Sequence, residues 1–326
     1  MPPTPSCSIR FIVAIALVVV AGATWAQSVA FPSKPLRVIV SVGAGGATDT
    51  LTRRMADRLA KSFGQSIVVE NMPAASGVVA AQTVARAAPD GHTILIGTNT
   101  THAGNASFIK NLAYDPVADF APITRMGIAA LVLCVNSTVP VANLQEFIAH
   151  AKALPGKLAF GSGTGSARLA TEMLKAKAGI DLLSVPYKGN AQALTDLRGG
   201  QIQILFGDIA LMLPHVRAGA VKALAVSSAT RSAAIPEMPT LSEAGVAGYE
   251  LVGFIAAFAP AKTPDPIVRS LNEEMTKILR DKEFVDSLVA MGIDAAPTTP
   301  DGLREWVVSE TRKWGELARA AGIQPE

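Results

Sequence analysis

The chain has 326 residues, of which 49% are hydrophobic, 5% aromatic and 17% charged, and its formal net charge at pH 7 is +3. A charge this close to neutral, without any block of Lys or Arg, argues against binding to nucleic acid. The low aromatic content argues against a surface that stacks on sugars.

The first 26 residues have the features of a secretory signal peptide. Arg10 precedes the apolar run of residues 11–21, and small residues follow before a cleavage point at Gln27. This order of segments is typical of exported proteins, and the run is shorter than the roughly 20 residues of a membrane span. We therefore expect a cleaved signal over residues 1–26 and a periplasmic protein; an uncleaved anchor helix is the alternative.

Cysteine is scarce. Cys7 precedes the apolar run of the signal, so it is not placed for lipid attachment, and Cys134 is the one cysteine after the cleavage point. Cys134 lies within the apolar run of residues 131–135, which favours a small buried side chain in a strand. No disulfide within the mature chain is possible.

Short apolar runs alternate with helical periods from residue 36 onward. In order, we expect a strand over Leu36–Val42, a helix over Thr48–Phe63 that ends at Gly64, a strand over Ser66–Val69, a helix over Gly77–Ala88 and a strand over Thr93–Gly97. The spacing of Asn143 and Glu146 is that of a capping box, and it predicts a helix running to Leu154.

The second half of the chain continues this alternation. We expect strands over Lys157–Phe160, Leu182–Tyr187, Ile202–Phe206 and Ala223–Val226, and helices near 166–178 and 190–198. The last part is expected to be helical, near Pro264–Arg280, Glu283–Met291 and Pro300–Ala321, with Thr299 as the cap of the last helix.

This alternation predicts an α/β fold with largely parallel sheets that are covered on both faces. About 300 residues exceed the usual size of a single core, so two lobes are expected. Two apolar stretches, Ala121–Val135 and Tyr249–Pro260, are the candidate crossings between them.

Two segments share one design, in which a loop of small residues follows a strand and precedes a helix. They are Gly43–Asp49 and Ser162–Ser166. At such helix N-termini the free backbone N–H groups and the positive end of the helix dipole favour an anion. Because one loop lies in each half of the chain, a hinged pair of lobes could hold one ligand between them.

The sequence gives little support for an enzymatic function. Thr48 occupies the third glycine position of a G-x-G-x-x-G pattern, and neither Ser162 nor Ser166 stands in a G-x-S-x-G elbow. The histidines lack the spacing of metal ligands, so neither metal nor cofactor is expected. His102 follows an expected strand end, where both a cleft role and a structural role remain open.

Ten short segments through the chain form a recognisable series: Phe31–Pro35, Ala44–Asp49, Val69–Asn71, Ala88–Gly91, Tyr114–Pro116, Asp119–Ile123, Val185–Gly189, Leu213–His215, Ala223–Val226 and Phe258–Pro260. In these segments, and in their order, the chain resembles a known family, the Bug-type solute receptors, which are the extracytoplasmic subunits of tripartite tricarboxylate transporters.

The resemblance implies a class II periplasmic binding protein, with two α/β lobes joined by a hinge and a ligand cleft between them. The expected division is a first lobe over 27–126 and 251–326 and a second lobe over 127–250. It also implies a small organic acid as ligand, permease subunits as partners, no nucleic acid, and a monomer without catalytic activity. The alternatives are a ligand-sensing partner of a membrane signalling protein, or a secreted enzyme that acts on an organic acid.

The residues expected at the ligand come from both loops and from three further segments. They are Gly43, Ala44, Gly45, Gly46, Ala47, Thr48, Asp49, Thr101, His102, Ser162, Thr164, Gly165, Ser166, Arg168, Gly207, Asp208 and Phe254. Tyr187 is expected either near the cleft or in a structural role.

Three of these residues depart from the family's pattern. The acid Asp208 is displaced by one position, Phe254 begins a pair where relatives carry Trp-Phe, and Arg168 stands where a small or polar residue is usual. If Ser166 caps its helix, Arg168 is the second helical residue, near the unfavourable positive end of the dipole. Arg168 then either pairs with Glu172, four residues on, or reaches a second anionic group of the ligand.

Overall fold

A computed structural model describes residues 31–187, 189–320 and 325 of the chain. The described residues from Lys34 onward form one compact unit. The expected signal peptide, residues 1–26, lies outside the described residues. No described helix is both long enough and apolar enough to cross a membrane.

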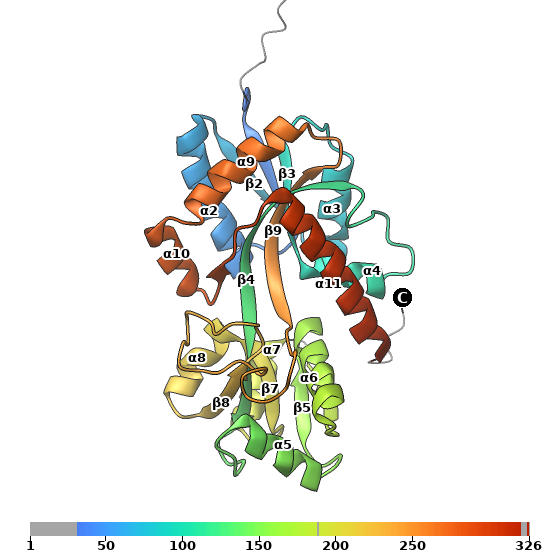
Figure 1. Ribbon diagram of the computed structural model, residues 1–326, viewed down its shortest axis with the longest axis vertical. Coiled ribbons are helices and arrows are strands. Elements are labelled where there is room, and N and C mark those ends of the chain that lie inside the picture. The colour runs from blue at the N-terminus through green and yellow to red at the C-terminus, as the bar shows by residue number, and fades with distance from the viewer. Residues whose placement is uncertain (1–30, 188, 321–324, 326) are drawn as a thin grey trace, which may run out of the picture. The chain divides into compact units, whose positions relative to one another are not determined.

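The described chain alternates strands and helices, as Figure 1 shows. The strands are β1 (Leu36–Val40), β2 (Ile67–Asn71), β3 (Thr93–Thr98), β4 (Phe120–Asn136), β5 (Ala159–Ser162), β6 (Leu183–Pro186), β7 (Ile204–Asp208), β8 (Val221–Val226), β9 (Val252–Pro260) and β10 (Asp294–Ala295). The helices are α2 (Ala47–Phe63), α3 (Val78–Ala85), α4 (Asn105–Phe108), α5 (Leu144–Ala153), α6 (Gly165–Ala178), α7 (Asn190–Arg198), α8 (Ile209–Arg217), α9 (Asp265–Ile278), α10 (Lys282–Val289) and α11 (Pro300–Ala320), with short turns η2 (Ala74–Gly77) and η3 (Thr100–Gly104).

The strands form two groups that share β4. The first strand group has the order β2-β1-β3-β9-β4, and the second joins β4 to β8 and to β7-β5-β6. In Figure 1, β4 runs through both groups. Along β4 the partner changes between Ala130, which pairs with Val252 of β9, and Leu131, which pairs with Asp208 of β7.

The sheets are mixed rather than largely parallel. The strands that alternate with helices are parallel, as in the pairs β1–β2, β1–β3, β5–β6 and β5–β7. However, β9 is antiparallel to β3 and β4, and β4 is antiparallel to β7 and β8. The prediction of largely parallel sheets was wrong, because the two stretches that were interpreted as crossings between lobes are themselves long antiparallel strands.

Pro122 made β4 difficult to predict as a strand, because proline donates no hydrogen bond and is rare in sheet interiors. The structure accommodates it with an irregular register. The pairing of β4 with β9 shifts between Pro122 and Thr124, and again between Arg125 and Gly127. Such bulges insert an unpaired residue and bend the strand, so β4 continues without a break to Asn136.

The helix ends follow the local signals in the sequence. Gly64 ends α2 in the left-handed conformation, with φ of 64°. The Asn143 side chain accepts a hydrogen bond from the Glu146 N–H at 2.9 Å, and Thr299 accepts one from the Gly302 N–H at 3.1 Å. One detail differs from the expected capping box, because the Glu146 carboxylate accepts from the Ala142 N–H at 2.7 Å.

One cluster of the core extends through both strand groups and contains large aromatic side chains such as Trp314, Phe160 and Phe206. Cys134 lies on β4 and is fully buried, and burial raises the pKa of its thiol to about 12. The interpretation of Cys134 as a small buried side chain is therefore confirmed.

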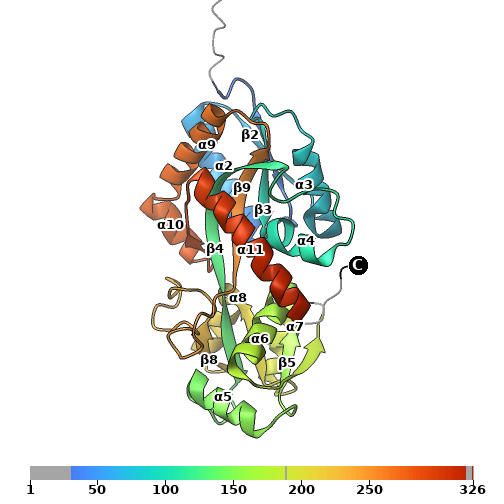
Figure 2. The ribbon, with the colours of Figure 1, turned by 45° about the vertical axis from the view of Figure 1, so that its right-hand side comes forward.

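The long C-terminal helix α11 contacts elements of both groups. It packs against β4, η3 and α4 and also against α6. Figure 2 shows it crossing in front of β4 and β9 toward α6.

Candidate functional site

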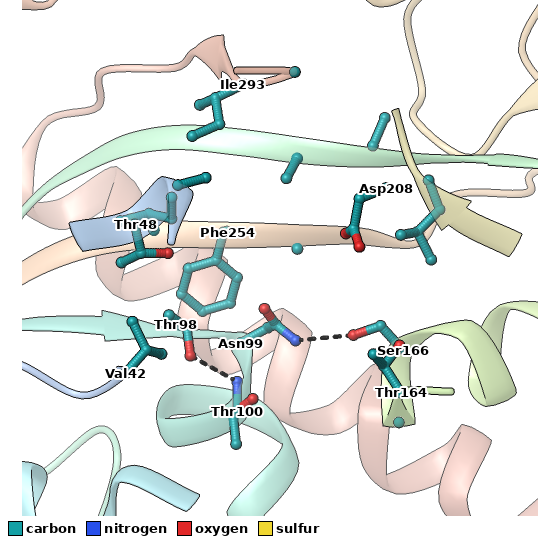
Figure 3. A pocket seen from close by; sticks show the side chains of 18 of the residues that line it. Val42, Thr48, Thr98, Asn99, Thr100, Thr164, Ser166, Asp208, Phe254 and Ile293 are labelled. Carbon is teal, nitrogen blue, oxygen red and sulfur yellow. Dashed lines mark hydrogen bonds between the residues drawn. The ribbon is translucent and has the colours of Figure 1, made fainter. Parts of the chain in front are cut away.

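A cavity of about 950 Å³ is lined by residues of both strand groups. Its volume lies within the roughly 300–1,000 Å³ of small-molecule sites. The polar lining comes from the N-termini of α2 and α6, the segment after β3, the end of β7, and single residues of η2 and α4. The apolar lining comes from β4, β9, α4, α8, α11 and the turn 291–293. Figure 3 shows the labelled polar side chains around Phe254.

The first turn of α2 presents free backbone donors to this cavity. Gly46 precedes the helix in an extended conformation, and no side chain caps it. The first intrahelical bond runs from the Thr50 N–H to the Gly46 carbonyl, at 2.9 Å. The N–H groups of Ala47 and Thr48 therefore lack acceptors within the helix, and both residues line the cavity.

Asp49 shapes the loop before α2 and does not line the cavity. Its buried carboxylate accepts hydrogen bonds from the Gly45 N–H at 2.9 Å, from Arg53 at 3.1 Å and from Asn71 at 2.9 Å. Burial alone would raise the pKa of Asp49, but these donors outweigh it and hold the pKa below its usual value. Asp49 therefore fixes the conformation of the loop that orients the N-terminus of α2.

The N-terminus of α6 lines the cavity from the other strand group. Thr164 caps this helix, because its Oγ1 accepts from the Ala167 N–H at 3.1 Å. The cap is thus two residues earlier than Ser166, the residue that the sequence suggested. Gly165 and Ser166 are the first two helical residues and line the cavity, so their N–H groups are also available to an anion.

A direct contact joins the two strand groups across the cavity. The Asn99 side-chain amide donates to the Ser166 hydroxyl at 3.4 Å, and Figure 3 draws this bond. Asn99 follows β3 and lines the cavity together with Thr98 and Thr100. From the sequence, the functional residues of this segment were expected two and three positions after Asn99, at Thr101 and His102.

Gly163 holds the loop before α6 tightly against its neighbours. A Cβ atom at this position would overlap the backbone of Gly189 and Asn190, and would lie 2.7 Å from the Asn190 Oδ1. A Cβ atom at Gly165, in contrast, would meet nothing within 4 Å. Only the first of these two glycines is therefore required for packing.

Replacing Gly163 with alanine is expected to lower the free energy of unfolding by about 1–3 kcal/mol, because the loop and the start of α7 must move apart. Gly165→Ala is the matched control and is expected to change it by less than about 0.5 kcal/mol. Urea unfolding of both variants measures the difference. Equal losses, or none in Gly163→Ala, would show that the loop is not held in this way.

Arg168 lines the cavity as an exposed cation without an ion pair among the described residues. The expected alternative, a pair with Glu172, is wrong in this structure, because Glu172 pairs with Lys175 at 3.0 Å. Since Thr164 caps α6, Arg168 is the fourth helical residue and lies farther from the positive end of the dipole than the sequence suggested.

Asp208 ends β7 and lines the cavity near α6. It occupies the N-cap position of α8, yet its side chain makes no capping hydrogen bond. The Asn190 amide donates to it at 3.5 Å. The carboxylate is thus available to the cavity.

The structure brings about half of the expected site residues to the cavity and leaves the rest outside its lining. Those that line it are Ala47, Thr48, Thr164, Gly165, Ser166, Arg168, Asp208 and Phe254. Those that do not are Gly43, Ala44, Gly45, Gly46, Asp49, Thr101, His102, Ser162 and Gly207.

Thr101 and His102 are outside the lining because the chain after β3 forms a π-helical turn that directs them inward. The Thr101 hydroxyl donates to the Thr98 carbonyl at 3.1 Å. The His102 ring stacks on Phe258 with ring centres 3.7 Å apart, and burial lowers its pKa to about 3. Of the two roles left open for His102, the structure therefore supports the structural one.

Ser162, Gly207 and Tyr187 were also considered as cleft residues, and contacts within the protein account for each of them. The Ser162 hydroxyl donates to the Val185 carbonyl at 3.4 Å. A Cβ atom at Gly207 would lie 2.7 Å from Met212, so close packing accounts for this glycine. The Tyr187 hydroxyl donates to Asp196 at 2.7 Å and does not line the cavity.

Several lining residues had no signal in the sequence. Trp314 comes from α11 and Ile293 from the turn after α10, both far along the chain from the two loops. Their sequence surroundings are those of ordinary core residues, and only the tertiary fold brings them to the cavity.

The chain matches one family model, the tripartite tricarboxylate transporter family receptor, over residues 51–323. Among curated relatives, a UPF0065 protein of Bordetella pertussis is 35% identical over 324 residues, covering 99% of each chain. Protein BugT of the same organism is 32% identical over 297 residues, covering 90% of this chain and 91% of BugT.

Solved structures show the same fold. The R. palustris protein Rpa4515, solved with adipate, is 33% identical with a TM-score of 0.76, covering 91% of this chain and 100% of its own. MatC from Rhodopseudomonas palustris, solved with bound malate, is 31% identical with a TM-score of 0.69, covering 88% of this chain and 99% of its own. The fold is therefore that of periplasmic solute-binding proteins.

Proposed function

The chain belongs to the tripartite tricarboxylate transporter receptor family, and on that premise we propose that it is a periplasmic receptor that captures a small organic acid and delivers it to membrane permease subunits. The observation that carries this proposal is the pair of helix N-termini, those of α2 and α6, that line one cavity. Members of this family are solute-binding receptors and not enzymes.

A carboxylate is the ligand group that fits the polar side of the cavity. The N–H groups of Ala47, Thr48, Gly165 and Ser166 supply backbone donors at positive dipole ends. Arg168 adds a planar cation that can hold a carboxylate through two parallel hydrogen bonds. The adipate and malate bound by the two Rhodopseudomonas proteins are acids of this kind.

The proposal includes two lobes that close on the ligand, divided as 27–126 with 251–326 and 127–250. The change of pairing partner on β4 at Ala130 and Leu131 supports a boundary near the first of these limits. The return to the first strand group begins with β9 at Val252, close to the second limit. A ligand that contacts α2 and α6 together would favour a closed arrangement of the lobes.

Screening by thermal shift tests the proposed ligand class. An acid at 100 times its dissociation constant is expected to stabilise the folded state by about 2.7 kcal/mol and to raise the melting temperature by several degrees. Sugars and simple amines are expected to have no effect. Gly165→Phe places a bulky side chain at the cavity wall, where there is open space, and is expected to abolish the shift. The proposal fails if only sugars or amines raise the melting temperature, or if Gly165→Phe leaves the effect of acids intact.

A further inference from the structure

Asp208 is an anion on the wall of a cavity whose other polar groups favour anions. It lies where an acid commonly caps a helix, but α8 receives no capping bond from it. Its side chain is exposed and lines the cavity. In Figure 3 its oxygens are turned toward Asn99 and Ser166.

The described residues do little to neutralise the Asp208 carboxylate. Among the hydrogen bonds of the described residues, its side chain takes part in one, from the Asn190 amide at the long distance of 3.5 Å. Asn190 is 6% exposed and packs beside Gly163, and its own Oδ1 has no hydrogen-bond partner among the described residues. Arg168, the cation of the cavity lining, forms no ion pair with Asp208 in this structure.

Asp208, which forms no ion pair with any residue that the structure describes, disfavours a ligand whose charged groups are all carboxylates. A ligand carboxylate at the N-terminus of α6 would lie on the same side of the cavity as the Asp208 carboxylate (Figure 3), and two like charges close together repel each other. An α-amino acid removes this conflict, because its ammonium group is one carbon away from its carboxylate. The N–H groups of Gly165 and Ser166 can then hold the carboxylate while Asp208 accepts from the ammonium group.

We propose that Asp208 is a specificity-determining residue that selects acids with an ammonium group beside the carboxylate, so that the ligand is an α-amino acid. This inference rests on the proposed function and narrows its ligand class. Arg168 remains free to hold a second carboxylate, so an amino di-acid would satisfy both charged residues of the cavity.

Matched pairs of acids that differ by one amino group test this inference. The pairs are propionate and alanine, succinate and aspartate, glutarate and glutamate, and adipate and 2-aminoadipate, with malate added as a hydroxyl analogue of aspartate. Titration calorimetry of the mature protein measures these affinities. For the acid chain length that fits the cavity, we expect the amino acid of the pair to bind at least about tenfold more tightly than the plain acid. Asp208→Asn keeps the shape of the side chain and is expected to abolish this preference, partly by improving binding of the plain acid.

Asp281→Asn is the matched control, because Asp281 caps α10, with the Phe284 N–H at 3.0 Å, and does not line the cavity. It is expected to keep the preference of the natural protein, and circular dichroism of both variants checks that they fold. Equal or tighter binding of the plain acids would overturn the role of Asp208 while leaving the receptor proposal intact. Malate binding as tightly as aspartate would also overturn it, since a neutral donor would then suffice. If no acid of either kind binds, the receptor proposal itself fails, and this inference fails with it.

Discussion

Replacing Arg168 with alanine will weaken binding of a di-acid by roughly 10- to 100-fold and will leave binding of a mono-acid of equal chain length nearly unchanged. The reason is that hydrogen bonds to charged groups contribute about 1.5–3 kcal/mol, and the guanidinium group can make two of them to one carboxylate. Arg168 lines the cavity and is not engaged by Glu172, which pairs with Lys175. Its charge is therefore available to the ligand.

Titration calorimetry with succinate and butyrate, or with a pair of the chain length that fits the cavity, measures this difference. Arg168→Lys should recover part of the lost affinity, because it restores the charge without the planar fork. Arg198→Ala, at the exposed end of α7 outside the cavity lining, is the control and should not change either affinity. Equal losses for both acids in Arg168→Ala, or no loss, would return Arg168 to an ordinary surface role.

Acidification from pH 6.5 to pH 4.5 will lower the free energy of unfolding by about 2–3 kcal/mol through His102 alone, because one unit of pKa difference corresponds to about 1.4 kcal/mol. Burial lowers the pKa of His102 from 6.5 to about 3 in the folded protein. Below pH 6.5 the unfolded chain takes up a proton at this residue and the folded chain does not. Stability that is fully present above pH 6.5 is therefore lost progressively until about pH 3.

The slope of stability against pH separates this effect from simple loss of packing. His102 stacks on Phe258, so His102→Gln is expected to be less stable than the natural protein even at pH 7. The free energy of unfolding of this variant, measured with urea, should nevertheless depend less steeply on pH between 6.5 and 4.5. His150→Gln, on the surface helix α5, is the control and should keep the contribution of His102 to the slope intact. An unchanged slope in His102→Gln would contradict the buried, neutral state of this ring.

Local chemistry made much of the fold predictable. Glycine at the end of α2, Asn143 before α5 and Thr299 before α11 mark helix ends because each satisfies backbone groups within a few residues. The parallel strands were also predictable from local sequence, because each is a short apolar run beside a turn. What could not be predicted in this way was β4, where Pro122 obscures a long strand that depends on pairing with distant β9.

The candidate site was likewise predictable only where local sequence determines the structure. The two small-residue loops were visible in the sequence because each combines a strand end and a helix start, and the first turns of both helices do line the cavity. The π-helical turn after β3 was not visible, so Asn99 was overlooked in favour of His102. Trp314 was overlooked because only packing of α11 across both strand groups brings it there.

A crystal structure of the protein with the acid that raises its melting temperature most would show whether the two helix N-termini bind the ligand. We predict a carboxylate within hydrogen-bond distance of the N-terminal N–H groups of α2 or α6, in a ligand that contacts residues of both strand groups. An acid bound outside this cavity, or contacting one strand group alone, would rule out the proposed binding site.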